Sequence, residues 1–300
     1  AISSDTSSDL KLDATVNEQI EDRPRDWRWR IPFGWWLEVR RRGGRRYSKR
    51  WSWYQDLTPE LARLGIEIRR FRVDTKRFWH WTEVCGYRRM DYYDGGQQPT
   101  AINKWLEHFV SLELTAPRAG ERLIDVASRA SPFPDIARQH YRLEVFRQDL
   151  TYPEGIHGDQ IGGNAAAMPV ADGFADIMTL HCSFDHFEGD ADSRFLREAD
   201  RVLRPGGRVC ILPFYTHKRY SIQSDPETWQ DRSVSFDQEA LICLARGWGE
   251  THGRSYDAER VASRILPYLG DLEPVVYAVE NLDEIHPDVY LKFALLLTRP

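Results

Sequence analysis

The sequence predicts an α/β fold: a mostly parallel sheet with an antiparallel pair, formed by the last two strands, at one edge. Three observations support this prediction. From Gly120 onward, short apolar runs alternate with helical segments, as in strands joined by crossover helices. Asp125 lies near the end of the first strand, before a turn and a proline-started helix. Two β-rich runs, 274–279 and 289–297, follow near the end of the chain.

Each element is placed by its own pattern. Strands are short runs rich in apolar and β-branched residues, expected at 122–126, 143–146, 175–180, 208–213, 274–279 and 289–297. Helices begin at cap residues or prolines, and are expected at 58–64, 100–114, 133–140 and 193–203, the last closed by the Arg-Pro-Gly-Gly of 204–207. Period-two alternation predicts strands or extended arms at 27–30 and 51–53, with a turn at 41–46.

Composition divides the chain into three zones. Residues 1–22 are polar and lack aromatic residues, so we expect a loosely held tail. Residues 23–110 hold nine of the eleven tryptophans, and 23–50 contains eleven Lys or Arg against two acidic residues. We expect this zone to be a cap or subdomain. Its tryptophans would pack against the main domain, which we assign to 111–300, stack on a glycan, or bind nucleic acid together with the arginines.

Bulk properties exclude several classes of protein. No apolar run approaches the roughly 20 residues that cross a bilayer, and residues 1–22 lack the apolar segment of a signal peptide. The four cysteines are scattered and form no CxxC pair, so neither a zinc site nor a disulfide framework is indicated. A net charge of −5 gives no general argument for nucleic-acid binding. We therefore expect a soluble, cytoplasmic protein with no metal site.

The chemistry-bearing residues follow the predicted strands. Asp125 precedes the turn 127–131, where Ser131 is expected to cap the next helix with Pro132 at its first position. Such a turn binds nucleotides in α/β folds, since a helix N-terminus offers free N–H groups. Asp149 follows the second strand, where a carboxylate accepts both hydroxyls of a ribose.

In this order the motifs resemble those of a known family. They are 123–126 (LIDV), Asp149, 163–165 (GNA), 168–177 (MPVADGFADI), 185–187 (DHF) and 196–207 (LREADRVLRPGG). Together they resemble the Rossmann-like (class I, type-11-like) methyltransferases that depend on S-adenosylmethionine (SAM). The resemblance covers about a third of the chain firmly and implies SAM as the cofactor.

The resemblance also implies the cofactor-binding residues. Asp125 and the turn residues Ala127, Ser128 and Ser131 would hold the methionine part of SAM, Asp149 the ribose, Asn164 and Ala165 the adenine, and His181 with Cys182 would border the sulfonium. The family's turn is rich in glycine, whereas Ala127, Arg129 and Ser131 occupy those positions here. Glycine allows positive φ and close approach of the backbone to a ligand. The substitutions therefore indicate a reshaped SAM loop, weaker binding, or lost catalysis.

Three residues are candidates for removing the acceptor proton. His186 follows the predicted strand 175–180, Asp185 directly precedes His186, and His217 follows the predicted strand 208–213. A histidine titrates in the range useful for a general base. The neutral alternatives are a capping or packed histidine and a solvated loop.

The sequence thus predicts an O-methyltransferase with a small-molecule or glycan acceptor, such as a sugar hydroxyl of a nucleotide-sugar or polysaccharide. Two alternatives stay open: an inactive methyltransferase-fold binding or scaffold protein, suggested by the missing glycines, and an RNA methyltransferase, suggested by the Arg/Trp zone. We expect no general nucleic-acid partner, and a homo-oligomer stays open.

Overall fold

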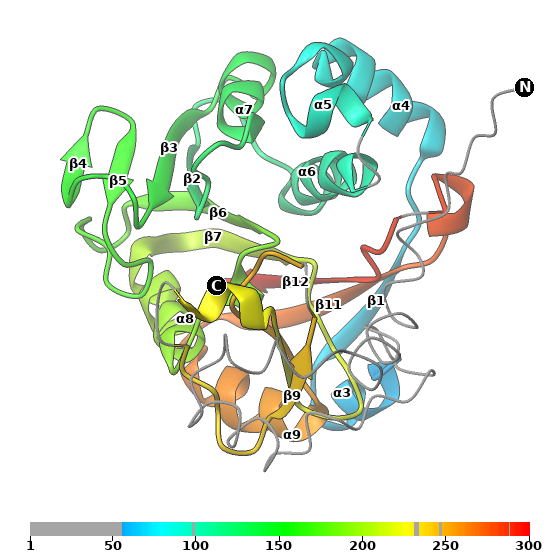
Figure 1. Cartoon of the computed structure of the whole chain (residues 1–300). Helices are drawn as coiled ribbons and strands as arrows, with labels where there is room; N and C mark the ends of the chain where they lie inside the picture. Colours follow the sequence, from blue (N-terminus) through cyan, green and yellow to red (C-terminus); the bar gives the residue numbers. More distant parts are fainter. Residues whose placement is uncertain (1–55, 98–99, 231–233, 246–247, 288) are drawn as a thin grey trace, which may run out of the picture. The chain divides into compact units, whose positions relative to one another are not determined.

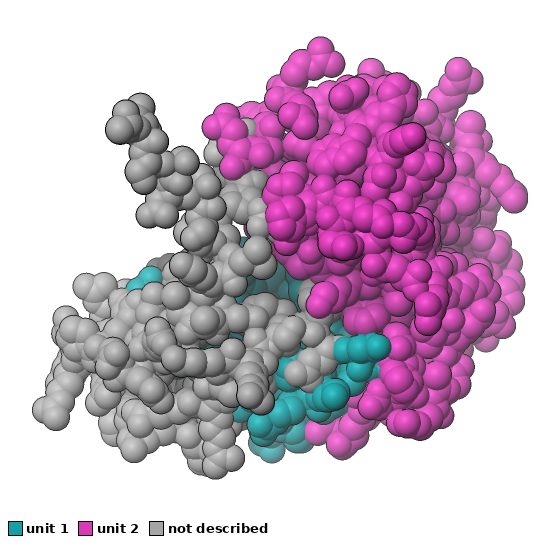
Figure 2. Space-filling model, turned by 90° about the vertical axis from the view of Figure 1, so that its right-hand side faces the viewer, with its two compact units in different colours: residues 1–57, 185–189, 215–257 teal, residues 58–184, 190–214, 258–300 magenta. Residues whose placement is uncertain are grey.

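A computed structural model describes residues 56–97, 100–230, 234–245, 248–287 and 289–300 (Figure 1). The elements predicted at 27–30, 41–46 and 51–53 lie outside these residues. The chain divides into two compact units (Figure 2). Unit 2 comprises 58–184, 190–214 and 258–300; the described part of unit 1 comprises residues 56–57, 185–189 and most of 215–257.

Unit 2 is built on a nine-stranded sheet with the order β1-β11-β12-β7-β6-β2-β3-β5-β4. The strands are β1 (Glu67–Phe71), β2 (Arg122–Val126), β3 (Glu144–Asp149), β4 (Gly155–His157), β5 (Gln160–Gly162), β6 (Ala175–His181), β7 (Leu203–Leu212), β11 (Glu273–Val279) and β12 (Phe293–Thr298). All except β12 and β4 run in one direction. This confirms the predicted α/β fold with a mostly parallel sheet.

Helices occur along the whole of unit 2, and those at 75–84 and 93–96 were not predicted. The helices are α3 (Thr58–Arg63), α4 (Thr75–Val84), α5 (Tyr93–Gly96), α6 (Ala101–Thr115), α7 (Phe133–Tyr141), α8 (Ala191–Val202) and α9 (Ala258–Arg260). Asp74 caps α4 by accepting the Arg77 N–H. Ser131 Oγ accepts the Phe133 N–H at 3.2 Å, and α7 begins at Phe133, with Pro132 directly before its first residue and not at its first position.

Aromatic residues from α4 and α6 fill much of the core. Phe78, Trp81, Tyr87, Trp105 and Phe109 are each at most 9% exposed and pack in one cluster with apolar residues of β2 and β3. Burial of a large apolar side chain stabilises a fold by about 1.5–3 kcal/mol. Residues 58–110, which we expected to be part of a separate cap, are in the same unit as the central sheet, and β1 pairs with β11.

Several boundaries differ from the prediction. Strand β7 begins at Leu203, so 204–207 lies in the strand and not in a helix-ending turn. The short strands β4 and β5 were not predicted, and β12 begins at Phe293 and not at Val289. The antiparallel strand β12 is not at the sheet edge: it lies between β7 and β11, and β11 runs parallel to the central strands. The sheet edge that is antiparallel is β4.

Unit 1 contains a three-stranded sheet that the sequence did not predict. Its strands are β8 (Ser221–Ser224), β9 (Leu241–Leu244) and β10 (Gly253–Ser255), in the order β10-β8-β9. Arg254 is fully buried beside this sheet and pairs with Asp237 at 2.9 Å. It also donates to the carbonyls of Phe187 and Gly189. These contacts make Arg254 part of a structural ion pair. Within the described residues, no helix has the length and apolarity needed to cross a membrane.

Candidate functional site

Three of the predicted residues lie at the carboxyl ends of adjacent parallel strands. Asp125 is the penultimate residue of β2, Asp149 ends β3 and His181 ends β6. β2 pairs with β3 on one side and β6 on the other, so the order of the strands reverses here. In open α/β sheets, ligands bind outside the carboxyl ends of the strands at such a switch point. The predicted residues therefore mark the expected binding edge.

The turn after β2 contains an alanine, Ala127, in a backbone conformation that usually favours glycine. Ala127 has φ +56°, in the left-handed region that disfavours residues with a Cβ atom. Its N–H is held by the side chain of Gln148, at 3.3 Å, and the Ser128 N–H by the Gln148 carbonyl, at 3.0 Å. Ala127 therefore adopts a conformation that glycine reaches without steric cost.

We expect the Ala127→Gly protein to be more stable than the wild type. Relief of left-handed strain, about 1–2 kcal/mol, outweighs the larger backbone entropy of unfolded glycine, about 0.5–1 kcal/mol. Thermal unfolding should shift upward by roughly 2–4 °C per kcal/mol gained. Ala130→Gly is the matched control, because Ala130 is also exposed in this turn but has no positive φ; it should lower stability. Equal losses in both variants would contradict the strain at Ala127.

Asp149 joins the end of β3 to the turn after β2. It is 8% exposed; its Oδ2 accepts the Arg129 N–H at 3.2 Å, and its Oδ1 accepts the N–H and hydroxyl of Thr151 at 2.9 and 2.7 Å. A carboxylate offers about four acceptor positions. Asp149 therefore retains acceptor capacity for a ligand hydroxyl while it orders the turn.

Gln148 is a residue of this site that the sequence analysis did not single out. It is 1% exposed; its side-chain oxygen faces the Ala127 N–H, and its side-chain nitrogen donates to the Gly163 carbonyl at 2.6 Å. One amide thus connects the loop after β2 with the loop after β5. In the sequence, Gln148 lies two residues beyond the predicted strand 143–146, so no pattern singled it out.

Asn164 and Ala165 lie in the loop that Gln148 holds. Asn164 is exposed, and its Oδ1 accepts the Ala166 N–H at 2.9 Å, which forms a tight turn. Ala165 is 6% exposed. The structure thus connects the two predicted adenine contacts to the end of β3 through Gln148.

Asp125 and His181 belong to a buried polar network. His181 Nδ1 lies 3.0 Å from Asp125 Oδ1, and its Nε2 lies 2.9 Å from the Ser111 hydroxyl of α6. Thr179 also donates to Asp125 Oδ1, at 2.8 Å.

The His108 ring packs 4.6 Å from the His181 ring. Burial, together with the neighbouring His181 and Lys104, holds the pKa of His108 well below its usual value.

Two side-chain oxygens at this edge are buried without a hydrogen-bond partner among the described residues. They are Asp125 Oδ2 and Ser128 Oγ. Buried polar groups are nearly always hydrogen-bonded, and an exception is costly unless a ligand or water completes it. Both residues were predicted to hold the methionine part of SAM. A polar ligand fits this donor and acceptor set.

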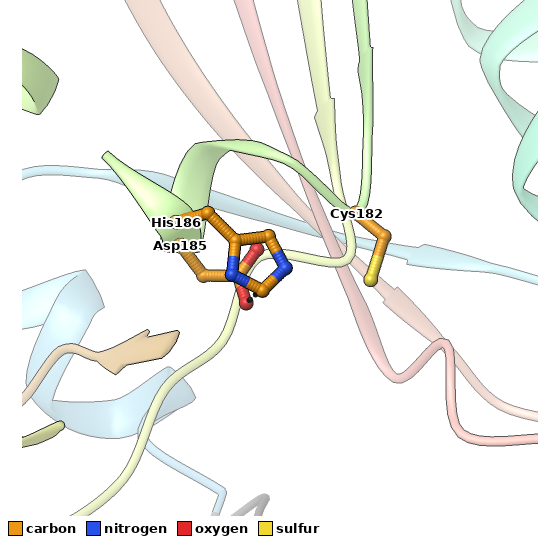
Figure 3. A group of neighbouring side chains, drawn as sticks. All are labelled: Cys182, Asp185 and His186. Atoms are coloured by element: carbon orange, nitrogen blue, oxygen red, sulfur yellow. Dashed lines mark ion pairs between the residues drawn. The ribbon is translucent and has the colours of Figure 1, made fainter. Parts of the chain in front are cut away.

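The catalytic candidates Asp185, His186 and His217 belong to unit 1. Figure 3 shows His186 facing Asp185, with Nε2 3.8 Å from Oδ2. His186 Nδ1 is hydrogen-bonded to the His252 carbonyl. Because a carbonyl only accepts, Nδ1 carries the proton and Nε2 of the neutral ring carries the lone pair. This tautomer has its basic nitrogen beside a carboxylate that stabilises the protonated ring.

His217 is less suited to remove a proton. It is 2% exposed, and its Nδ1 lies 3.0 Å from the Arg219 amide nitrogen and 3.1 Å from the Arg219 carbonyl oxygen. Burial lowers the pKa of His217, which disfavours uptake of a second proton.

Fold and site together define a class of protein. A mostly parallel sheet presents Asp125 and Asp149 at its switch point, with a left-handed turn between β2 and the start of α7. This is the arrangement of a Rossmann-like nucleotide-binding domain.

Comparison with known proteins makes the class specific. Residues 126–211 match the family model for a methyltransferase domain. A ubiquinone/menaquinone biosynthesis C-methyltransferase from Roseobacter denitrificans is 34% identical over 118 residues, which cover 34% of this chain and 46% of that protein. A demethylmenaquinone methyltransferase from Mycobacterium marinum is 34% identical over 101 residues, 30% of this chain and 42% of that protein. The chain thus spans about half the length of these curated relatives or slightly less.

Among solved structures, the 1,6-didemethyltoxoflavin-N1-methyltransferase of Burkholderia thailandensis aligns over 76% of this chain and 91% of its own, with a TM-score of 0.44 and 13% identity. The family match and the curated relatives confirm the resemblance seen in the sequence. Residues 126–211 therefore match a methyltransferase domain, and the sheet that contains them has a Rossmann-like fold.

Proposed function

We propose that this chain transfers the methyl group of SAM to an acceptor that loses a proton. The observation that carries this proposal is the pair of buried oxygens, Asp125 Oδ2 and Ser128 Oγ, that lack a partner in the described part of the binding edge. SAM, when bound, supplies an electrophilic methyl group; the protein aligns the acceptor with it and excludes water.

Different residues would bind the cofactor and remove the acceptor proton. Asp125 and the turn 127–131 would bind the methionine part, Asp149 the ribose and the loop at Asn164 the adenine. His186, with Asp185 beside it, would remove the acceptor proton. Titration of the protein with SAM and with S-adenosylhomocysteine tests the first half of this assignment. Absence of binding would favour an inactive methyltransferase-fold binding protein, as the glycine-poor turn suggests.

We expect Asp149→Ala to weaken SAM binding about ten- to a hundred-fold, because hydrogen bonds to a charged group contribute about 1.5–3 kcal/mol. The variant also loses the contacts to Arg129 and Thr151, so its melting temperature should fall as well. Asp149→Asn retains one acceptor oxygen and should bind SAM with intermediate affinity. Asp283→Ala removes an exposed carboxylate and serves as the control. Unaltered SAM affinity in Asp149→Ala would refute the ribose assignment.

The acceptor atom is the second half of the proposal. The sequence favoured a sugar hydroxyl, whereas the curated relatives are named as C-methyltransferases of quinone biosynthesis. Both reactions need a base: a hydroxyl must be deprotonated to become an oxygen nucleophile, and an aromatic carbon becomes nucleophilic when its ring hydroxyl is deprotonated. Methyl transfer from ¹³C-methyl SAM, followed by NMR of the product, distinguishes an O-methyl from a C-methyl group by chemical shift.

A further inference from the structure

Helix α6 carries a buried polar face that the methyltransferase assignment does not use. Asn103, Lys104, Glu107, His108 and Ser111 recur at helical spacing, and each is at most 8% exposed. Ser111 contacts His181 at the end of β6, so this face begins beside the binding edge. The rest of the helix is largely apolar, and polar groups in such a position are costly unless they are paired.

The far end of this face is held by a second contact within unit 2. Asn103 Oδ1 accepts the N–H groups of Tyr290 and Leu291 at 2.8 and 3.0 Å, and its Nδ2 donates to Glu107 Oε1 at 2.6 Å. These bonds tie α6 to the segment that precedes β12. The polar face is thus fixed at both ends, by His181 and by residues 290–291.

Lys104 is an incompletely hydrogen-bonded member of this face. Its residue is 8% exposed, and its ammonium makes one hydrogen bond among the described residues, to Glu107 Oε2 at 3.2 Å. An ammonium has three donors, so two of them lack a partner there. A buried cation is expensive to leave incompletely bonded.

The surroundings keep Lys104 charged. Burial alone lowers the pKa of this lysine, but Cys182, Glu107 and Tyr290 raise it, and the resulting pKa lies well above the usual value. Cys182 follows β6 directly and is the residue that the resemblance places beside the sulfonium. The ammonium therefore lies in the electrostatic environment of the end of β6 where the acceptor is expected.

We propose that Lys104 binds an anionic oxygen of the methyl acceptor, carried by a carboxylate or a phenolate. This inference rests on the proposed methyl transfer, since it assigns the charge of the acceptor for that reaction. The two ammonium donors without a partner among the described residues fit one such oxygen, and Glu107, itself held by Asn103, positions the ammonium. A neutral oxygen would accept from the same donors more weakly, because a hydrogen bond between two charged groups is the stronger one.

Small probes test this charge preference. Benzoate, 4-nitrophenolate and benzamide are titrated into the wild-type protein at pH 8.5, with and without saturating S-adenosylhomocysteine, and followed by tryptophan fluorescence. We expect either or both anions to bind at least about ten-fold more tightly than benzamide, the range for one charge-assisted hydrogen bond. Equal affinity for the anions and benzamide would overturn the inference.

Two variants separate binding from folding. Lys104→Gln should abolish the preference for the anions, but it leaves Glu107 buried without its cation and can unfold the protein. Lys104→Gln/Glu107→Gln removes both charges together and should fold, retain S-adenosylhomocysteine binding and lose the preference. Lys76→Gln, at an exposed position of α4, is the matched control and should retain the preference for the anions.

The outcomes are distinguishable from those of the proposed function. A preference for the anions that survives in the double variant shows that Lys104 is only structural. A protein that fails to bind S-adenosylhomocysteine but shows the Lys104-dependent preference contradicts the methyltransferase proposal and leaves an anion site.

Discussion

The His186→Ala protein is expected to turn over about a hundred-fold or more slowly than the wild type, while it binds SAM normally. Loss of a general base typically lowers a rate by 10²–10⁴-fold. The structure supports His186 over His217 because its Nδ1 is committed to the His252 carbonyl, which leaves Nε2 as the basic nitrogen. The measurement is single-turnover methyl transfer at saturating SAM, with the acceptor found by the product screen.

Matched variants exclude a purely structural explanation. His186→Asn keeps a donor for the His252 carbonyl but has no basic nitrogen, so it should be as slow as His186→Ala. Asp185→Asn retains the imidazole and removes the charge that stabilises its protonated form, so a smaller loss is expected. Near-normal turnover in His186→Asn, with an inactive His217→Ala, would transfer the role to His217.

The Arg254→Leu protein should lose about 3–5 kcal/mol of stability, the range for breaking a buried ion pair from one side. Arg254 is fully buried and bonds Asp237 through two nitrogens, at 2.9 and 3.2 Å. Removal leaves Asp237 without its cation, and it also leaves the carbonyls of Phe187 and Gly189 without their donor. Because these carbonyls follow His186 in the chain, turnover should fall together with stability. Denaturant unfolding and hydrogen exchange of residues 185–189 measure the two effects.

An exposed arginine of the same unit provides the control. Arg219→Leu should change stability by no more than about 0.5 kcal/mol, as is usual for surface substitutions. If Arg254→Leu were equally mild, the ion pair with Asp237 would be replaceable by apolar packing. In that case the segment 185–189 would have to be held by other contacts.

Sequence patterns predicted the central elements of unit 2 well. β2 was predicted at its observed bounds, and β6 and α7 were each one residue longer than predicted. These are buried elements whose apolar periodicity is strong. The strands β4 and β5 have three residues each, and the sheet of unit 1 is equally short in β10. Such strands are stabilised by their neighbours and not by a local pattern, so the sequence alone could not indicate them.

The residues of the candidate site were likewise predicted only in part. Asp125 and Asp149 were predicted because acidic residues at strand ends follow a recognisable order. Lys104 was missed because a polar residue within a helix usually faces solvent, and Gln148 because it lies beyond the predicted strand 143–146. Only the three-dimensional structure shows that both are buried. The left-handed conformation of Ala127 was also beyond prediction, since the missing glycine suggested a reshaped turn.

The Gln148 amide has a consequence for how a cofactor is recognised. Because it bonds the Ala127 N–H and the Gly163 carbonyl at once, two loops that would otherwise fluctuate separately are coupled before any ligand arrives. Ordering of loops on binding reduces affinity, and a preformed arrangement avoids most of that entropic loss. A cofactor should therefore bind at this edge to a preformed site, with little rearrangement of the two loops.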